Sequence, residues 1–255
     1  MNIHNTKKSL MTHIVLGYPD MNTNKELIKV MSDAGVGYIE MQIPFSDPIA
    51  DGPTIVNANQ QALKHNITLK DCFDFAEDMA SSYKNINFLF MSYYNILFSA
   101  GIENFVKTVK SANLYGLIIP DIPFEEDMEG FFPACIEKHL NAVYVISPTT
   151  PETRLKRIRN VVSGFVYCTS RIGITGADKN PHRKLEQYVR KAKRILNVPI
   201  AVGFGIDSAE KAKAISGFAD IIVIGSKVIN MVNQYGRDFQ KPVYEFLYEV
   251  KKAIT

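Results

Sequence analysis

Two carboxylates, Glu40 and Asp51, stand out because an apolar strand and a stiff loop would hold them. The segment 38–55 reads YIEMQIPFSDPIADGPTI, so Glu40 lies near the end of an apolar run and Asp51 lies in the following loop. The three prolines of the loop restrict its backbone. Carboxylates held in this way can exchange protons with a substrate, which predicts an acid/base site. The alternative is a solvated turn, because DP and DGP are common turn strings.

Small residues near the end of the chain indicate a phosphate site. The strings GFGI at 203–206 and IGS at 224–226 each follow an apolar run. Glycine lets the backbone N–H groups approach an anion closely, and the hydroxyl of Ser226 can donate a further hydrogen bond. We therefore expect Gly203, Gly205, Gly225 and Ser226 to hold a phosphate group. The alternative is a pair of turns followed by a helix-capping serine.

Eight short apolar runs, alternating with helical patterns, would position these residues. Continuous apolar runs are typical of parallel strands that are covered on both faces. The runs span residues 12–17, 36–42, 87–94, 115–121, 141–147, 164–170, 199–206 and 219–225. The helical patterns span residues 25–34, 69–82, 102–112, 125–140, 151–162, 183–196, 208–215 and 242–254.

This alternation predicts one α/β domain over residues 1–255, a (β/α)8 TIM barrel with its active site at the C-terminal ends of the strands. A doubly wound open sheet is the alternative, although no GxGxxG string follows the first run. The candidate residues all fall at those strand ends. They are Gly17, Glu40, Tyr93, Asp121, residues 167–176, residues 203–206, Gly225 and Ser226.

Composition excludes several classes of partner. A net charge of +3 is too small to predict nucleic-acid binding. The three cysteines are widely spaced, which argues against a disulfide framework or a zinc site and favours a reducing compartment. No run reaches the roughly 18 apolar residues of a membrane span, and the N-terminal residues lack the apolar core of a signal peptide. We expect a cytoplasmic protein without a bound metal.

Four motifs in order resemble the α subunit of tryptophan synthase. They are VLGYPD at 15–20, IPFSDPIADGPTI at 43–55, SRIGITGA at 170–177, and GFGI with IGS. The resemblance extends from about Leu10 to the C-terminus. It implies a lyase that cleaves indole-3-glycerol phosphate to indole and glyceraldehyde 3-phosphate. It also implies no cofactor in this chain and a pyridoxal-phosphate-dependent β subunit as partner, in an α2β2 heterotetramer.

The resemblance also implies roles for individual residues. Glu40 would protonate the indole C3 and take the glycerol hydroxyl proton, whereas Asp51 would stay ionised and accept the indole N–H. Glu40 would then need a raised pKa. Thr175, in a mobile loop, would meet the loop aspartate when that loop closes. The residues expected to bind substrate are Tyr93, Tyr167, Thr175, Gly176, Phe204, Gly205, Gly225 and Ser226.

Two residues depart from the family pattern. Gln42 replaces a glycine that usually lies two positions after the catalytic acid, and His13 occupies a position that is aromatic or apolar in relatives. We expect Gln42 to alter the surroundings of Glu40 and His13 to be a satisfied barrel histidine. One alternative function is a catalytically weak regulatory subunit that activates β. Another is a different sugar-phosphate barrel enzyme, although no lysine for a Schiff base ends a strand.

Overall fold

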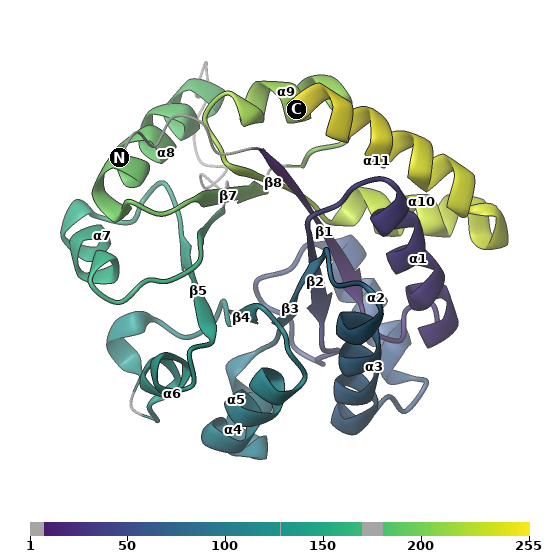
Figure 1. Cartoon of the computed structure of the whole chain (residues 1–255), viewed down its shortest axis with the longest axis horizontal. Coiled ribbons are helices and arrows are strands. Elements are labelled where there is room, and N and C mark those ends of the chain that lie inside the picture. Colours follow the sequence, from purple (N-terminus) through teal and green to yellow (C-terminus); the bar gives the residue numbers. More distant parts are fainter. Residues whose placement is uncertain (1–7, 128, 170–180, 204) are drawn as a thin grey trace.

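The computed structural model describes residues 8–127, 129–169, 181–203 and 205–255, and these residues form a closed barrel (Figure 1). Eight parallel strands pair in chain order, and β8 closes the barrel against β1. The predicted strands are therefore confirmed, and the alternative of an open doubly wound sheet is wrong. The strands are β1 (Ser9–Val15), β2 (Tyr38–Gln42), β3 (Asn87–Met91), β4 (Gly116–Ile118), β5 (Asn141–Ile146), β6 (Val166–Thr169), β7 (Ile200–Gly203) and β8 (Ile221–Ile224).

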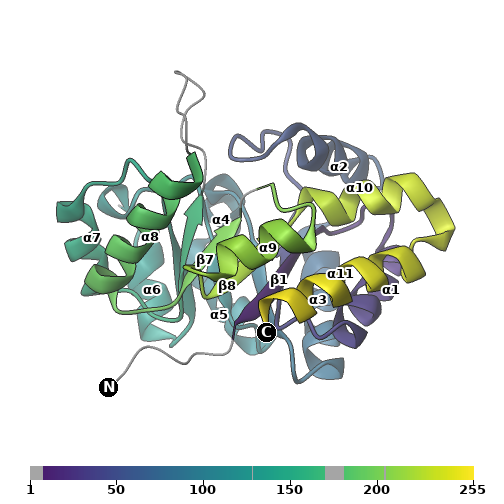
Figure 2. The same cartoon turned by 90° about the horizontal axis from the view of Figure 1, so that it is seen from above.

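Helices surround the strands in chain order, from α1 to α11 (Figure 1). They are α1 (Met21–Asp33), α2 (Pro53–Leu63), α3 (Leu69–Ser82), α4 (Tyr94–Ala100), α5 (Ile102–Ser111), α6 (Phe131–Glu137), α7 (Glu152–Arg159), α8 (Pro181–Leu196), α9 (Ala209–Ser216), α10 (Ser226–Tyr235) and α11 (Gln240–Ile254). Sequence patterns did not predict α2, α4 or α10. Helices α2 and α10 pack together at one end of the barrel (Figure 2). In the described part of the chain, no helix is both long and apolar enough to cross a membrane.

The helical pattern predicted at 125–140 is wrong in its first half. A short 3-10 turn, η1 (Phe124–Glu126), is followed by a break at Gly130, whose φ of 77° lies in the left-handed region. The carboxylate of Asp127 then accepts the N–H groups of Phe131 and Phe132 at 2.7 and 2.8 Å. These free donors belong to the first turn of α6, so Asp127 fixes where that helix begins.

The barrel interior changes from apolar to polar along its axis. Side chains alternate between the inside and the outside of each strand, so every second residue faces the interior. The inner apolar cluster contains Met11, Leu89, Ile118, Val143 and Phe165. One layer nearer the C-terminal ends, His13 of β1 lies directly opposite Glu40 of β2. The alternation therefore brings polar side chains together above an apolar floor.

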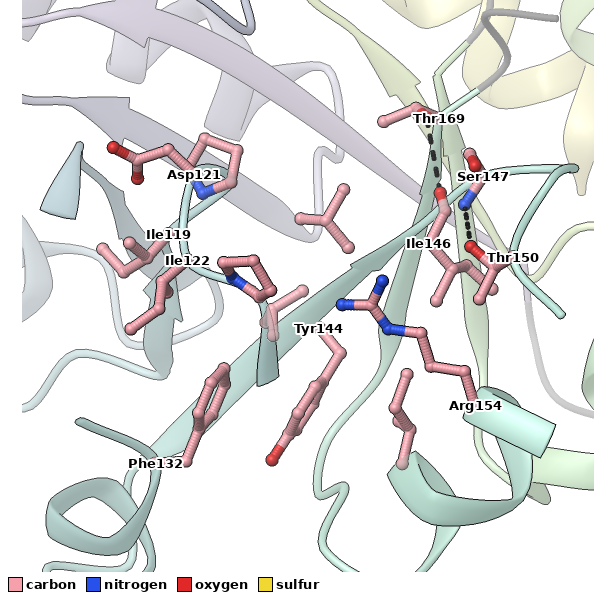
Figure 3. A pocket seen from close by; sticks show the side chains of 15 residues that line it. Ile119, Asp121, Ile122, Phe132, Tyr144, Ile146, Ser147, Thr150, Arg154 and Thr169 are labelled. Carbon is pink, nitrogen blue, oxygen red and sulfur yellow. Dashed lines mark hydrogen bonds between the residues drawn. The ribbon is translucent and has the colours of Figure 1, made fainter. Parts of the chain in front are cut away.

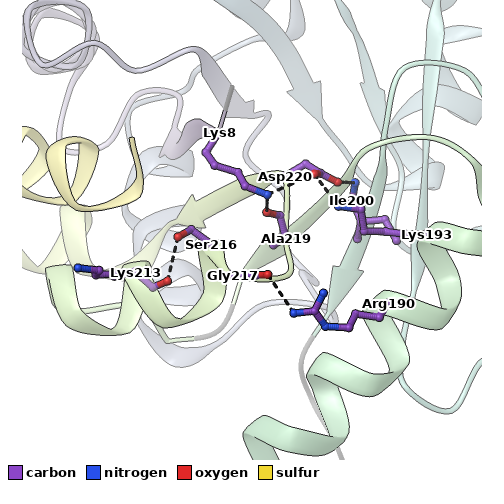
Figure 4. Close-up of polar contacts among 9 residues, drawn as sticks. All are labelled: Lys8, Arg190, Lys193, Ile200, Lys213, Ser216, Gly217, Ala219 and Asp220. Carbon is purple, nitrogen blue, oxygen red and sulfur yellow. Dashed lines mark hydrogen bonds and ion pairs between the residues drawn. The ribbon is translucent and has the colours of Figure 1, made fainter. Parts of the chain in front are cut away.

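A buried acid ties the strands together at the opposite end of the barrel (Figure 4). Asp220 is 6% exposed, and its Oδ2 accepts the Ile200 N–H at the start of β7 at 3.0 Å. Its Oδ1 lies 2.7 Å from Lys193 Nζ and 3.5 Å from Lys8 Nζ. Lys8 also donates to the Ala219 carbonyl at 2.7 Å. These contacts join the first strand to the last two. They lie at the end of the barrel away from the site, so we expect them to stabilise the fold rather than to take part in a reaction.

Candidate active site

One cavity of about 520 Å³ opens at the C-terminal ends of the strands and contains both predicted carboxylates. This volume lies in the range of small-molecule sites. Strands β1, β2, β5, β6, β7 and β8 contribute to its wall, as does the loop after β2. The lining residues are His13, Glu40, Ala50, Asp51, Gly52, Ile55, Pro120, Val145, Tyr167, Thr169, Gly203, Gly205, Ile206, Val223, Gly225 and Ser226.

Glu40 lies in the wall of this cavity beside a histidine. The residue is 6% exposed, and its Oε1 lies 3.4 Å from the Nδ1 of His13, which is 4% exposed. Burial alone would lower the pKa of His13, but the charge of Glu40 and the hydrogen bond to it raise that pKa above its ordinary value of 6.5. The Nε2 of His13 is buried without a hydrogen-bond partner among the described residues. Among the described residues, His13 is therefore paired through Nδ1 and not through Nε2.

Asp51 enters the cavity from the loop and is held by two donors. Its Oδ2 accepts from Gln42 Nε2 at 2.7 Å and from the Tyr93 hydroxyl at 2.9 Å. Burial raises the pKa of Asp51, while nearby His13 and the two hydrogen bonds partly lower it. The side chain of Gln42 is wholly buried. We expected Gln42 to act on Glu40, but its hydrogen bond is to Asp51, because the loop brings Asp51 back over the end of β2.

The loop between β2 and α2 is fixed by buried contacts. The Phe45 N–H donates to the side chain of Asn59, which in turn donates to the Ile55 carbonyl. The Phe45 ring stacks on Tyr93 with centroids 5.2 Å apart. The Ala50 N–H donates to the Tyr93 hydroxyl at 3.1 Å. These contacts place Asp51 with little freedom, which is what an acid/base group needs.

The opposite side of the cavity is built from glycines and the start of a helix. A Cβ on Gly203 would lie 2.5 Å from the Tyr167 hydroxyl oxygen, so only glycine leaves room for that tyrosine. Gly225 directly precedes α10, which begins at Ser226. Backbone N–H groups at the first turn of a helix are free to bind an anion. Gly205, with a φ of 46°, completes this corner, which we name the glycine corner.

The structure brings most of the predicted site residues to one place. Glu40, Asp51, Tyr167, Gly205, Gly225 and Ser226 line the cavity. Tyr93 is instead fully buried behind Asp51, and its hydroxyl supports that carboxylate. Asp121 accepts the Tyr94 N–H at 2.9 and 3.1 Å at the start of α4. Thr175, Gly176 and Phe204 lie outside the described residues.

Sequence reasoning missed several lining residues, among them Ile55 and Val223. Val223 lies two positions before Gly225, so strand alternation alone could have found it. Ile55 gives no such signal, because it belongs to helix α2, which the sequence did not predict. Among the described residues, no group of three or more His, Cys, Asp or Glu side chains could hold a metal ion.

A smaller cavity of about 250 Å³ lies between β4, β5 and α7 (Figure 3). Its wall is mostly apolar, and Phe132 stacks on Tyr144 with centroids 4.6 Å apart. The guanidinium of Arg154 extends over this cavity. It is already paired with Glu125, with Nη2 and Oε2 3.0 Å apart. The two carboxylates and the glycine corner line only the larger cavity, so we assign the chemistry there.

Comparisons with known proteins agree with this architecture. The family model described as "Tryptophan synthase alpha chain" matches residues 2–254. The tryptophan synthase alpha chain of Syntrophotalea carbinolica is 43% identical over 228 residues, 89% of each chain. That of Petrotoga mobilis is 38% identical over 250 residues, 98% of this chain and 95% of the relative.

Solved structures show the same relationship. The tryptophan synthase subunit alpha of Legionella pneumophila superposes with a TM-score of 0.87 at 27% identity, over 97% of this chain and 92% of that one. The Pyrococcus furiosus tryptophan synthase complex contains a chain that superposes with a TM-score of 0.84 at 29% identity, over 96% of this chain and 99% of that one. The chain therefore belongs to the tryptophan synthase alpha chain family.

Proposed function

We propose that this chain cleaves indole-3-glycerol phosphate to indole and glyceraldehyde 3-phosphate, as the alpha subunit of a tryptophan synthase. The observation that carries the proposal is the content of the larger cavity. Two carboxylates, Glu40 and Asp51, share this space with the glycine corner, as acid/base cleavage of a phosphorylated substrate requires. The family relationship supplies the identity of the substrate.

In this proposal, the phosphate binds at the glycine corner. The N–H groups at the start of α10 and the hydroxyl of Ser226 donate to its oxygens. The substrate then extends across the cavity to Glu40 and Asp51. Its phosphate, which does not react, fixes the position of the bond to be broken.

The reaction needs a proton at C3 of the indole ring and the loss of a proton from the adjacent glycerol hydroxyl. Glu40 serves both steps, since the bond between the ring and the glycerol carbon breaks as the hydroxyl becomes an aldehyde. Asp51 accepts the hydrogen bond of the indole N–H. Its two donors, Gln42 and Tyr93, both bond Oδ2 and leave Oδ1 for the substrate.

The partner in this proposal is a tryptophan synthase β subunit that carries pyridoxal phosphate, in an α2β2 assembly in the cytoplasm. The Pyrococcus furiosus relative was solved as a tryptophan synthase complex. On this chain, Ile49 in the loop after β2 is 77% exposed, and Phe98 of α4 is 56% exposed. Exposed apolar side chains beside an active site suit a protein interface. The three cysteines are buried free thiols whose pKa values burial raises to about 12, as suits a reducing compartment.

The test is release of indole from indole-3-glycerol phosphate by the purified chain, with and without a β subunit. Glu40→Gln keeps the side-chain shape but cannot carry a proton, so we expect the rate to fall at least about 100-fold. Glu137→Gln, which changes an exposed glutamate of α6, is the matched control and should leave the rate unchanged. Near-parental cleavage by Glu40→Gln would contradict the assigned role. No cleavage by the parental chain in complex with β would contradict the proposed function.

A further inference from the structure

Two pairs of buried or half-buried polar groups include the two carboxylates of the cavity. His13 Nδ1 lies 3.4 Å from Glu40 Oε1, and Gln42 Nε2 lies 2.7 Å from Asp51 Oδ2. Glu40 and Gln42 lie two residues apart on β2, so their side chains leave the same face of the strand.

A charged imidazole at this position would face two acids. Glu40 lies opposite His13 on β2, and the charge of Asp51 also acts on the imidazole. Tyr167 of β6 lines the same cavity, and Tyr18 lies near the other side of His13. Helix α10 brings only the apolar side chains of Val228, Ile229 and Val232 to that side, among the described residues. The imidazole therefore has two acids and no basic group among these neighbours.

We propose that His13 is a positioning residue that shares one proton with Glu40, so that the His13–Glu40 pair, rather than Glu40 alone, is the acid/base unit of this enzyme. The inference rests on the proposed function and adds a residue to it. Gln42 belongs to the neighbouring pair, in which it donates to Asp51.

The His13–Glu40 pair can give and take back each proton that the reaction moves. Before cleavage, the proton lies on His13 Nδ1 and Glu40 is a carboxylate. The Nδ1–H bond breaks as an O–H bond forms on Glu40, and that proton then passes to C3 of the indole. When the carbon–carbon bond breaks, the glycerol hydroxyl loses its proton to Glu40, and this proton returns to His13. No external acid or base is consumed.

This arrangement predicts a change in pH dependence. The pair keeps its proton until the pH exceeds the raised pKa of His13, and replacing His13 removes the group that holds this proton. In His13→Phe, the alkaline limb of the kcat/KM profile should therefore move down by about one pH unit or more. His13→Gln can donate to Glu40 but cannot titrate, so it should show the same shift with a smaller loss of kcat at low pH. His139→Asn removes an exposed imidazole and should keep the parental profile.

A second measurement does not depend on turnover. Imidazole NMR signals of the whole chain, assigned with His13→Gln, should show that His13 titrates above 6.5 in the parental protein. In Glu40→Gln, the midpoint should fall by about one unit, because the neighbouring charge is gone.

Two results would overturn the inference. One is a uniform loss of rate in both His13 variants without movement of the alkaline limb. The other is a His13 midpoint that Glu40→Gln does not change. A parental chain that cleaves no indole-3-glycerol phosphate would refute the proposed function instead, and the NMR titration would then still decide whether His13 and Glu40 share a proton.

Discussion

Removal of the Tyr93 hydroxyl tests how Asp51 is held in the cavity. Tyr93→Phe keeps the fully buried ring and its stacking on Phe45, and it deletes one atom. The lost hydroxyl donates to Asp51 Oδ2 at 2.9 Å and accepts the Ala50 N–H at 3.1 Å. Ala50 is exposed, so water can replace the second bond. The main effect therefore falls on the carboxylate.

The magnitude follows from the charge of the acceptor. A hydrogen bond to a charged group contributes about 1.5–3 kcal/mol, against about 0.5–1.5 kcal/mol for a neutral one. Burial already raises the pKa of Asp51 above its ordinary value of 3.8, so ionisation of this group costs stability at neutral pH. Tyr93→Phe should raise that pKa further and lower the free energy of unfolding by about 1.5–3 kcal/mol at pH 7.

The sign of the pH dependence makes the prediction specific. Well below pH 3.8, Asp51 is protonated in both the folded and the unfolded chain, so only the neutral hydrogen bond is lost. The stability difference between Tyr93→Phe and the parental chain should therefore shrink as the pH falls from 7 through the raised pKa of Asp51. Urea unfolding at several pH values measures it. The control is Tyr248→Phe, which deletes a hydroxyl from a half-exposed ring of α11 and should have no effect.

A constant difference between pH 7 and the lowest pH at which the chain stays folded would refute this reasoning, because it would show that the hydroxyl does not act on the ionised carboxylate. The same variant should also move the acid limb of the kcat/KM profile to higher pH. Asp51 must be ionised to accept the indole N–H, and a raised pKa delays that ionisation.

Two further changes test the glycine corner and the opposite end of the barrel. Ser226→Ala should raise KM for the phosphorylated substrate about 3–10-fold with little change in kcat, because one hydrogen bond to a group that does not react is lost; an unchanged KM would place the phosphate elsewhere. Asp220→Asn should lower the free energy of unfolding by about 1–3 kcal/mol, since it leaves Lys193 and Lys8 without their partner. Urea unfolding measures that loss, and kcat/KM should stay unchanged. The control is Asp78→Asn, in an exposed pair with Lys25, which should have little effect on stability or on kcat/KM.

The strands were predictable because they are buried on both faces. Runs such as 87–94 and 219–225 are continuously apolar, and in the structure they contain β3 and β8. Helix α3 was also predicted with its observed bounds, and the capping box of Thr68 and Asp71 fixes its start. The helices α2, α4 and α10 were missed for a physical reason. Each directly follows a strand-end segment that was interpreted as part of the site, and the buried face of α2 includes the polar Asn59.

The composition of the site was predictable, but its contacts were not. The barrel rule places Glu40, Asp51 and the glycine corner at one end, because all follow the C-terminal ends of strands. Contacts between strands depend on their register. An apolar run that is longer than its strand does not reveal which residues of two neighbouring strands lie opposite each other. The pairing of His13 with Glu40 follows from a register in which Met11 lies opposite Tyr38. Similarly, the bond from Gln42 to Asp51 depends on a loop that folds back over β2.

The side chains of His13 and Gln42 are best understood together. A glutamine beside two carboxylates can donate through only one nitrogen, and here Gln42 Nε2 donates to Asp51. Its Oε1 is then buried and has no hydrogen-bond partner among the described residues, as is also true of His13 Nε2. An unpaired buried acceptor is costly, whereas a buried acid beside a charged imidazole is favourable. Glu40 is such an acid, and its charge raises the pKa of His13. Burial of His13 and Gln42 is therefore offset mainly by their contacts with the two acids, Glu40 and Asp51.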